Sequence, residues 1–195
     1  MLRLAEKMSR LGTETAFDVL ARAETLAQEG RDIINLGIGQ PDFKTPEHIV
    51  EAAIKALHDG HHGYTPSPGI PQLRKSVARD LATYRGVNVA PDRIVIVPGG
   101  KVTMFFAILM FGEPGVDILY PNPGFPIYQS VIEFTGARAV PVRLLEENDF
   151  SFDAETILSQ ITEDTRLLIL NSPANPTGGA ASKTEMDRLV AGLTD

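Results

Sequence analysis

Short apolar strands alternate with helical patterns over the C-terminal half of this 195-residue chain, and the alternation constrains its fold more than any other feature. The run from Ile94 to Val97 is too short and too continuously apolar for anything but a buried strand. Strands separated by helices predict a parallel sheet covered by helices on both faces. We expect strands at 94–97, 116–120, 139–142 and 167–170, and helices at about 101–111, 125–135 and 153–160 and from 182 onward.

Helical patterns separated by loops occupy the first ninety residues. Gly30 suits the end of the first helix, because glycine readily adopts the left-handed conformation found there. Thr45 as N-cap and Pro46 as first helical residue mark the start of the second. We expect helices at 13–29, about 46–58 and about 71–84, an extended piece at 33–42 and a loop at 61–69.

Composition excludes several classes of function. Eighteen basic against twenty-five acidic side chains give a net charge of −7, so the chain lacks the basic surface of a nucleic-acid-binding protein. The absence of cysteine excludes a disulfide scaffold, a thiolate metal site and a cysteine nucleophile. No apolar run approaches the roughly 18 residues of a membrane span, and the first ten residues lack the apolar stretch of a signal peptide. We expect a cytoplasmic protein with no nucleic-acid or membrane partner.

The histidines and the glycines do not form the common catalytic or nucleotide-binding motifs. His61 and His62 are adjacent, but no carboxylate cluster stands at ligand spacing around them, so we interpret them as solvated loop residues and expect no metal. A Gly-x-Ser-x-Gly elbow is missing, and so are a Walker-type loop and a dinucleotide-binding glycine pattern. A hydrolase triad or a nucleotide site therefore finds no support.

A glycine pair follows the first expected strand. Gly99 and Gly100 would let the backbone approach a ligand closely, and the helix that begins after them offers unpaired N–H groups that suit a phosphate. Lys101 could add a positive charge. The alternative is that the glycines form only a tight turn, and this loop alone does not decide between the two.

Two more unusual loops follow expected strands. In the loop 120–128, Phe125 could lie over a flat heterocycle, although core packing is the favoured interpretation without further context. The loop 171–179 holds two asparagines and two prolines, which suit fixed hydrogen bonds to a ligand oxygen. Its alternative is plain turn chemistry. In an open α/β sheet, ligands bind beyond the carboxyl ends of the strands, where all three loops are expected.

Together and in this order, the motifs resemble those of the pyridoxal-phosphate-dependent aminotransferases of class I/II, fold type I. The resemblance spans the whole chain, which corresponds to the N-terminal half of such enzymes. It implies a truncated α/β fold of three layers with a mostly parallel sheet. Residues 1–45 would form an N-terminal arm and a segment of the small domain, and residues 46–195 an incomplete cofactor-binding large domain. The five motifs lie at 35–43, 64–69, 97–103, 120–128 and 171–178.

The resemblance also implies roles in holding pyridoxal 5′-phosphate. The turn Gly99-Gly100-Lys101 would bind its phosphate through the backbone N–H groups of Gly100 and Lys101. Phe125 would stack on the pyridine ring, and Asn175 would donate to the 3′-oxygen.

Further roles concern the substrate and the partner subunit. Gly39 would lie with its backbone against the substrate, where Asn175 is also expected. Lys101 has a second candidate role near the distal carboxylate of an acidic substrate. Tyr64 matches the tyrosine that reaches the phosphate of the partner's site in family dimers, so the full-length protein is expected to be a homodimer.

The family's catalytic residues have no match here. Such enzymes hold the cofactor as a Schiff base on a lysine that lies well beyond the position of Asn175. None of the six lysines fits that position, so we expect no catalytic residue in this chain and no turnover by it alone. The chain ends within an amphipathic helix that starts near Ser182, and we expect it to be a fragment.

The resemblance favours an aminotransferase that moves an amino group between an amino acid and a 2-oxo acid. One alternative is a pyridoxal-phosphate-dependent carbon–sulfur lyase, because such enzymes share these N-terminal motifs. Another is a non-catalytic module, or half of a split enzyme that a second chain completes.

Overall fold

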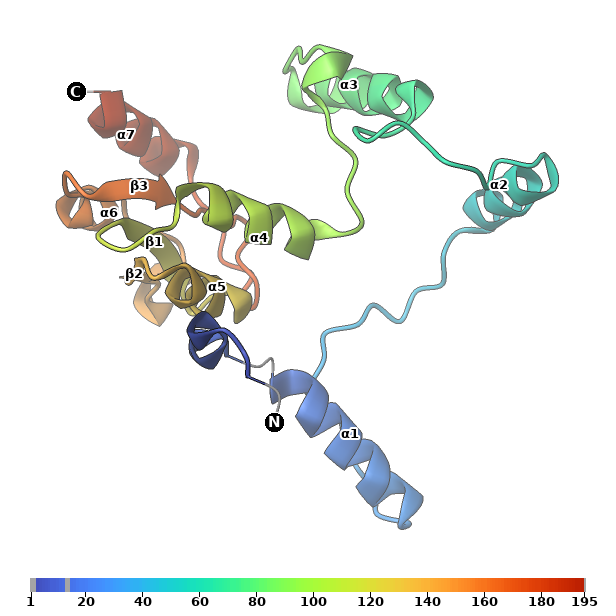
Figure 1. The fold of residues 1–195 in the computed structure, drawn as a ribbon, viewed down its shortest axis with the longest axis horizontal. Coiled ribbons are helices and arrows are strands. Elements are labelled where there is room, and N and C mark those ends of the chain that lie inside the picture. Colours follow the sequence, from blue (N-terminus) through green and yellow to red (C-terminus); the bar gives the residue numbers. More distant parts are fainter. Residues whose placement is uncertain (1–2, 13–14, 195) are drawn as a thin grey trace. The chain divides into compact units, whose positions relative to one another are not determined.

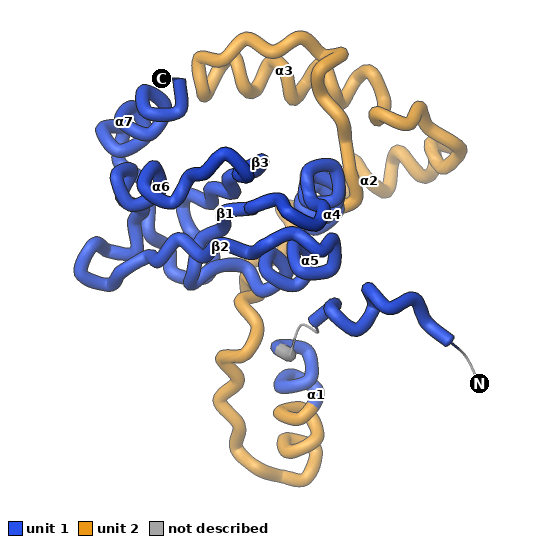
Figure 2. The backbone as a smooth tube through the Cα atoms, turned by 60° about the vertical axis from the view of Figure 1, so that its left-hand side comes forward, with its two compact units in different colours: residues 1–21, 101–195 blue, residues 22–100 orange. Residues whose placement is uncertain are grey.

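The structure, a computed structural model, describes residues 3–12 and 15–194, except for the side chain of Thr15. The chain divides into two compact units, which Figure 2 colours separately. The first contains residues Met1–Ala21 and Lys101–Asp195, and the second contains Arg22–Gly100.

The first unit is built on a parallel sheet. Its central strand is β1, and the order is β2-β1-β3 (Figure 1). Ile118 of β1 stands opposite Ala139 of β2 on one side and Leu167 of β3 on the other. The strands are β1 at Asp117–Asn122, β2 at Arg138–Arg143 and β3 at Thr165–Leu168.

Helices cover both faces of this sheet. Two helices pack on the face of Ile118 and two on the face of Leu119. The first pair is α4 at Gly100–Phe111 with α5 at Ile127–Thr135, and the second is α6 at Ala154–Gln160 with α7 at Lys183–Thr194. The expected α/β fold with three layers and a parallel sheet is therefore confirmed.

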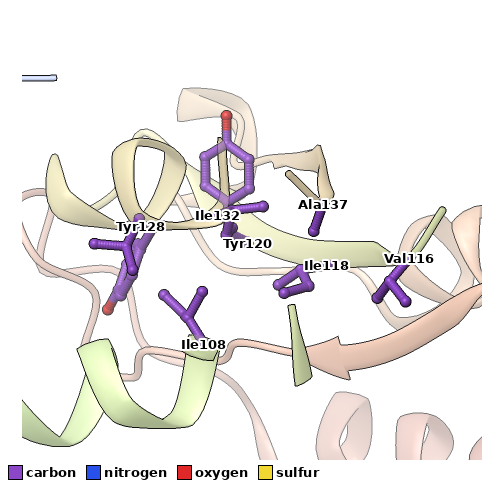
Figure 3. Packing of buried hydrophobic residues seen from close by; sticks show 8 residues of the cluster. Ile108, Val116, Ile118, Tyr120, Tyr128, Ile132 and Ala137 are labelled. Carbon is purple, nitrogen blue, oxygen red and sulfur yellow. The ribbon is translucent and has the colours of Figure 1, made fainter. Parts of the chain in front are cut away.

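Alternation along β1 places its side chains in two separate cores. Ile118 and Leu119 are both 0% exposed, one on each face. Figure 3 shows Ile108 of α4, Ile118 of β1 and Ile132 of α5 lying together in the first core. Each such side chain contributes about 1.5–3 kcal/mol through burial. Burial on both faces is the reason that Ile118, Leu119 and Tyr120 follow one another without a charged residue between them.

An ion pair between a buried carboxylate and an exposed guanidinium ties the start of β1 to β2. Asp117 is only 3% exposed, and Arg138 donates from Nε to its Oδ1 over 2.6 Å and from Nη2 to its Oδ2. The hydroxyl of Thr162 donates to the same carboxylate over 3.2 Å. The hydrogen bond from Arg138 lowers the pKa of Asp117 below its ordinary value.

An N-terminal arm lies on α5. It contains a single helical turn, η1 at Glu6–Arg10. Arg10 donates from Nε to the carbonyl of Glu133 over 3.0 Å, and the N–H of Gly12 donates to Ser130 Oγ over 2.8 Å. Arg10 thus supplies a cation to the carbonyl end of α5, where the helix dipole favours positive charge.

The second unit consists of helices and loops. The expected end of the first helix at Gly30 is confirmed. The φ of Gly30 is +86°, and the N–H of Arg31 donates to the carbonyl of Leu26. Residues 13 and 14, the first two expected in this helix, lie outside the described residues. The helices are α1 at Thr15–Gln28, which begins in the first unit, α2 at Glu47–His58 and α3 at Pro71–Arg85, followed by the turn η2 at Pro91–Arg93.

The expected cap of α2 is wrong by one residue. Pro46 occupies the cap position with a ψ of 139°, and no side chain caps the helix. The carbonyl of Pro46 accepts from the N–H groups of Ile49 and Val50 instead. Thr45 is therefore one position too early to act as the N-cap.

The strand expected at 94–97 is absent from this unit. Ile94 is buried as expected, but its carbonyl accepts from Arg74 Nε over 2.8 Å, and the N–H of Ile96 donates to the carbonyl of Pro68. Gly69 contacts Ile96 so closely, at a φ of +97°, that a Cβ there would collide with it. A strand forms only by hydrogen bonding to a neighbouring strand. Among residues 22–100, the hydrogen-bond partners of this segment are instead the side chain of Arg74 and the loop at Pro68.

The other expected elements are confirmed within about two residues. The third strand of the sheet begins and ends two residues earlier than expected, although Ile169 N still donates to Leu119 O and continues the pairing. Among residues 3–12 and 15–194, no helix is both long and apolar enough to cross a membrane. A further single turn, η3, lies at Glu146–Asn148 between β2 and α6.

Candidate functional site

Parallel pairing brings the ends of two strands to one edge of the sheet. β1 ends at Asn122 and its neighbour β3 ends at Leu168. The segments 123–126 and 169–182 leave the sheet from this edge. This is the edge where open α/β sheets bind ligands, and it carries two of the three predicted loops.

The start of α4 exposes its backbone. Gly99 has a φ of +87°, a conformation that favours glycine, and Gly100 is the first residue of the helix. A Cβ at either position would meet no other atom within 4 Å, so the backbone is open to a ligand. The first turn of any helix leaves N–H groups without intrahelical partners, and these attract anions.

Lys101 and Phe125 lie together. The Lys101 ammonium is 5.5 Å from the centre of the Phe125 ring and 5.5 Å from that of Phe17. Both distances suit a cation–π interaction. The Phe125 ring also meets Tyr128 edge-on, with 6.1 Å between centres. The structure therefore joins the positive charge after the glycine turn to the aromatic ring after β1.

The loop that follows β3 folds back on itself. The N–H of Ala174 donates to the carbonyl of Gly179 over 2.7 Å, and the N–H of Gly178 donates to the carbonyl of Ala174 over 2.7 Å. Ala174 is buried in the second core, whereas Asn175 is exposed. The carboxamide of Asn175 makes no hydrogen bond to any residue that the structure describes.

Tyr64 and Gly39 belong to the other unit. Tyr64 lies fully exposed in the loop between α2 and α3. Gly39 lies exposed in the segment between α1 and α2, with no atom within 4 Å of a Cβ at its position. Their roles toward a cofactor or a substrate remain predictions.

One titratable side chain that contacts Phe125 has a shifted pKa. Burial raises the pKa of Tyr128, so this hydroxyl beside Phe125 stays neutral near pH 7. Within the described part of the chain, no three His, Asp or Glu side chains lie close enough to hold a metal ion.

Sequence reasoning missed two neighbours of the predicted residues. Phe17 is far from Lys101 in sequence, and no local signal links them. Asn171 accepts a hydrogen bond from the backbone N–H of Asn175 over 2.8 Å. Its position directly after an apolar strand was a usable signal, because asparagine commonly bonds to nearby backbone in turns.

Comparison with known proteins gives a family match. The family model described as aminotransferase class I and II matches residues 31–194. This range includes all the motifs singled out above and every predicted site residue.

Individual relatives agree with the family match. The aspartate aminotransferase of Bacillus subtilis is 33% identical over 188 residues, which are 96% of this chain and 48% of that relative. The probable aspartate/prephenate aminotransferase of Aquifex aeolicus is 36% identical over 187 residues, again 96% and 48%. The chain thus spans about half the length of the curated relatives it matches.

Solved structures show the same fold. The aspartate aminotransferase from Thermus thermophilus with maleate superposes with a TM-score of 0.93 at 33% identity, covering 100% of this chain and 51% of that one. The alanine aminotransferase from Pyrococcus furiosus gives 0.90 at 31% identity, covering 97% and 49%.

Proposed function

Since this chain belongs to the class I and II aminotransferase family, we propose that it supplies the pyridoxal 5′-phosphate site of an enzyme that moves an amino group between an amino acid and a 2-oxo acid. The observation that carries the proposal is the meeting of Lys101 with Phe125, 5.5 Å from ammonium to ring centre. When bound, the cofactor supplies a ring that accepts electrons from the substrate.

The start of α4 binds the phosphate. Gly100 is the first residue of α4 with open space beside it, and the helix N-terminus favours a negative charge there. Gly99 permits the approach because no side chain covers the backbone at this position. The fit of the residues to a phosphate therefore rests on an open backbone cradle and one adjacent cation.

Phe125 and Asn175 orient the ring. Phe125 is half-buried against Tyr128, so its position is defined while part of its surface remains available for stacking. Asn175 presents an exposed carboxamide at the same sheet edge, and its N–H₂ group donates to the 3′-oxygen. An aromatic face and one amide donor suit a flat ring that carries a single oxygen.

Lys101 has one of two roles. It neutralises the cofactor phosphate, or it binds the distal carboxylate of an acidic substrate. The names of the relatives, aspartate and aspartate/prephenate aminotransferases, favour an acidic amino acid as substrate. Gly39 lies with its backbone against that substrate in the same proposal.

The complete site includes residues beyond those that this structure brings together. We propose a cytoplasmic homodimer in which Tyr64 reaches the phosphate of the partner's site. Residues 1–45 form the arm and small-domain segment, and residues 46–195 belong to the large domain. The lysine that carries the cofactor is not among the six lysines of the chain, so the 195 residues alone have no transaminase turnover.

Equilibrium dialysis of the chain against pyridoxal phosphate and against pyridoxal tests the proposal. We expect at least about tenfold tighter binding of the phosphate form, because a charge-assisted contact is worth about 1.5–3 kcal/mol. Phe125→Ala weakens both ligands, whereas Lys101→Met weakens only the phosphate form if Lys101 serves the phosphate. Phe106→Ala and Lys75→Met are matched controls on exposed side chains.

Either of two results would contradict the proposal. Equal affinity for the two ligands would exclude phosphate binding at α4. Transamination by the purified chain, with no other polypeptide present, would show that one of its own lysines is catalytic.

A further inference from the structure

The loop between β3 and α7 is organised around the carboxamide of Asn171. Its Oδ1 accepts from the backbone N–H of Asn175 over 2.8 Å, and its Nδ2 donates to the carbonyl of Pro173 over 3.3 Å. Asn171 is half-buried, and both hydrogen bonds lie in the exposed part of the loop. One side chain therefore holds the backbone of the loop at two points.

The base of the loop is fixed by other contacts. Ser172 Oγ accepts from the N–H of Ala181 over 2.9 Å. Gly179 packs on the carbonyl oxygens of Asp149 and Phe150 so closely that a Cβ would collide with both. Those two residues have φ values of 50° and 53°, a strained conformation for side chains other than glycine. The base therefore has contacts of its own that do not involve Asn171.

The tip of the loop depends on Asn171. Ala174 is buried, but Asn175 is exposed, and its own carboxamide has no hydrogen-bond partner among the described residues. The peptide that joins Asn175 to Ala174 is held on both sides: its N–H donates to Asn171, and the Ala174 carbonyl accepts from the N–H of Gly178. Asn171 is the one side chain among these partners. A functional group is held to useful precision only when its supporting residues are fixed in turn.

We propose that Asn171 is a positioning residue: through the backbone N–H of Asn175 it sets the direction in which the Asn175 carboxamide meets the 3′-oxygen of pyridoxal phosphate. This inference rests on the proposed function. Asn171 itself does not touch the cofactor, and its contribution passes through the loop backbone.

Hydrogen exchange of the ligand-free chain tests the hydrogen bond without using activity. In Asn171→Ala we expect the Asn175 N–H to exchange at least about tenfold faster than in the wild type, because its acceptor is gone. Asn171→Asp retains an oxygen acceptor at the same place and is expected to restore protection. Asn88→Ala, in an exposed loop and without a side-chain hydrogen bond among the described residues, is the matched control.

Binding of two ligands tests the consequence for the cofactor. Asn171→Ala is expected to weaken pyridoxal phosphate about fivefold to tenfold. With the 3-deoxy analogue of pyridoxal phosphate, which lacks the 3′-oxygen, wild type and Asn171→Ala should bind equally, as should Asn175→Ala. The ligand difference separates positioning of Asn175 from a general loss of structure, which would weaken both ligands.

The outcomes separate the two proposals. A wild-type chain that binds no pyridoxal phosphate overturns the proposed function, and this inference falls with it. Normal wild-type binding with unchanged affinity in Asn171→Ala overturns only the positioning role. Unchanged exchange of the Asn175 N–H in that variant, or an equal loss of affinity for both ligands, does so as well.

Discussion

Residues 101–195 and residues 22–100 differ sharply in how they bury their apolar side chains. Every buried hydrophobic side chain that the structure describes lies between residues 108 and 189, except Ile94. The first region contains a sheet with helices on both faces, and the second contains helices and loops. The difference shows that an apolar helix face becomes a core only where a second element packs against it.

The helices of the second region demonstrate the same point. Leu57 of α2 is 62% exposed and Leu73 of α3 is 42% exposed, although both stand at apolar positions of a helical pattern. The pattern is sufficient to predict the helix, since it is local. Burial depends on contacts with distant residues, which residues 22–100 do not supply at these positions.

A matched pair of core substitutions tests this difference most directly. Ile118→Ala removes a fully buried side chain between α4 and α5, and we expect a loss of about 4 kcal/mol in the free energy of unfolding. Leu73→Ala is expected to cost less than about 1 kcal/mol, because the side chain is already partly in water. Urea unfolding followed by circular dichroism measures both, and equal losses would remove the distinction between the regions.

The ion pair of the buried Asp117 gives a second, smaller effect within the sheet. Asp117→Asn keeps the shape but removes the charge that Arg138 pairs with, and we expect a loss of about 2 kcal/mol. Asp187→Asn, in the exposed pair with Lys183, is the control and should cost less than about 0.5 kcal/mol. A control as costly as Asp117→Asn would mean that burial of the carboxylate does not matter.

The same pair predicts a dependence on acid. The pKa of Asp117 is lowered in the folded state, mainly by the hydrogen bond from Arg138, so the unfolded chain binds a proton more readily. The free energy of unfolding therefore falls as the pH drops below the ordinary Asp value of about 3.9 toward the lower folded value. Asp117→Asn should flatten the dependence over this range. Unfolding curves at a series of pH values that remain parallel for the two proteins would contradict this.

The smallest effect concerns the segment 94–97. Arg74→Ala removes the donor to the Ile94 carbonyl, and we expect the amides of 95–97 to exchange about fivefold faster. Arg85→Ala, on the last residue of the same helix, should leave them unchanged. Unaltered exchange in Arg74→Ala would show that this segment has a support other than α3 and the loop at Pro68.

Much of the fold was predictable because its signals are local. The helices α3, α4 and α6 and the strands β1 and β2 follow from periodicity and apolar runs, and Gly30 follows from the geometry of a helix end. The segment 94–97 was not predictable from its own apolar sequence, since pairing needs a partner strand. The prediction of the α2 cap was wrong by one residue. Thr45 is a suitable N-cap and Pro46 a suitable first helical residue, but the helix begins after Pro46.

The candidate site divides in the same way. The sequence by itself determined the residue types: a glycine turn before Lys101, Phe125 after a strand, and Asn175 in a stiff loop, because each depends on a motif of a few neighbouring residues. Only the tertiary structure decided that Lys101 meets Phe17 and Phe125, whereas the bond from Asn175 to Asn171 is local and had a signal in the sequence. The contacts of Lys101 arise from the packing of α4 in one core with β1 and α5, which no short stretch of sequence specifies.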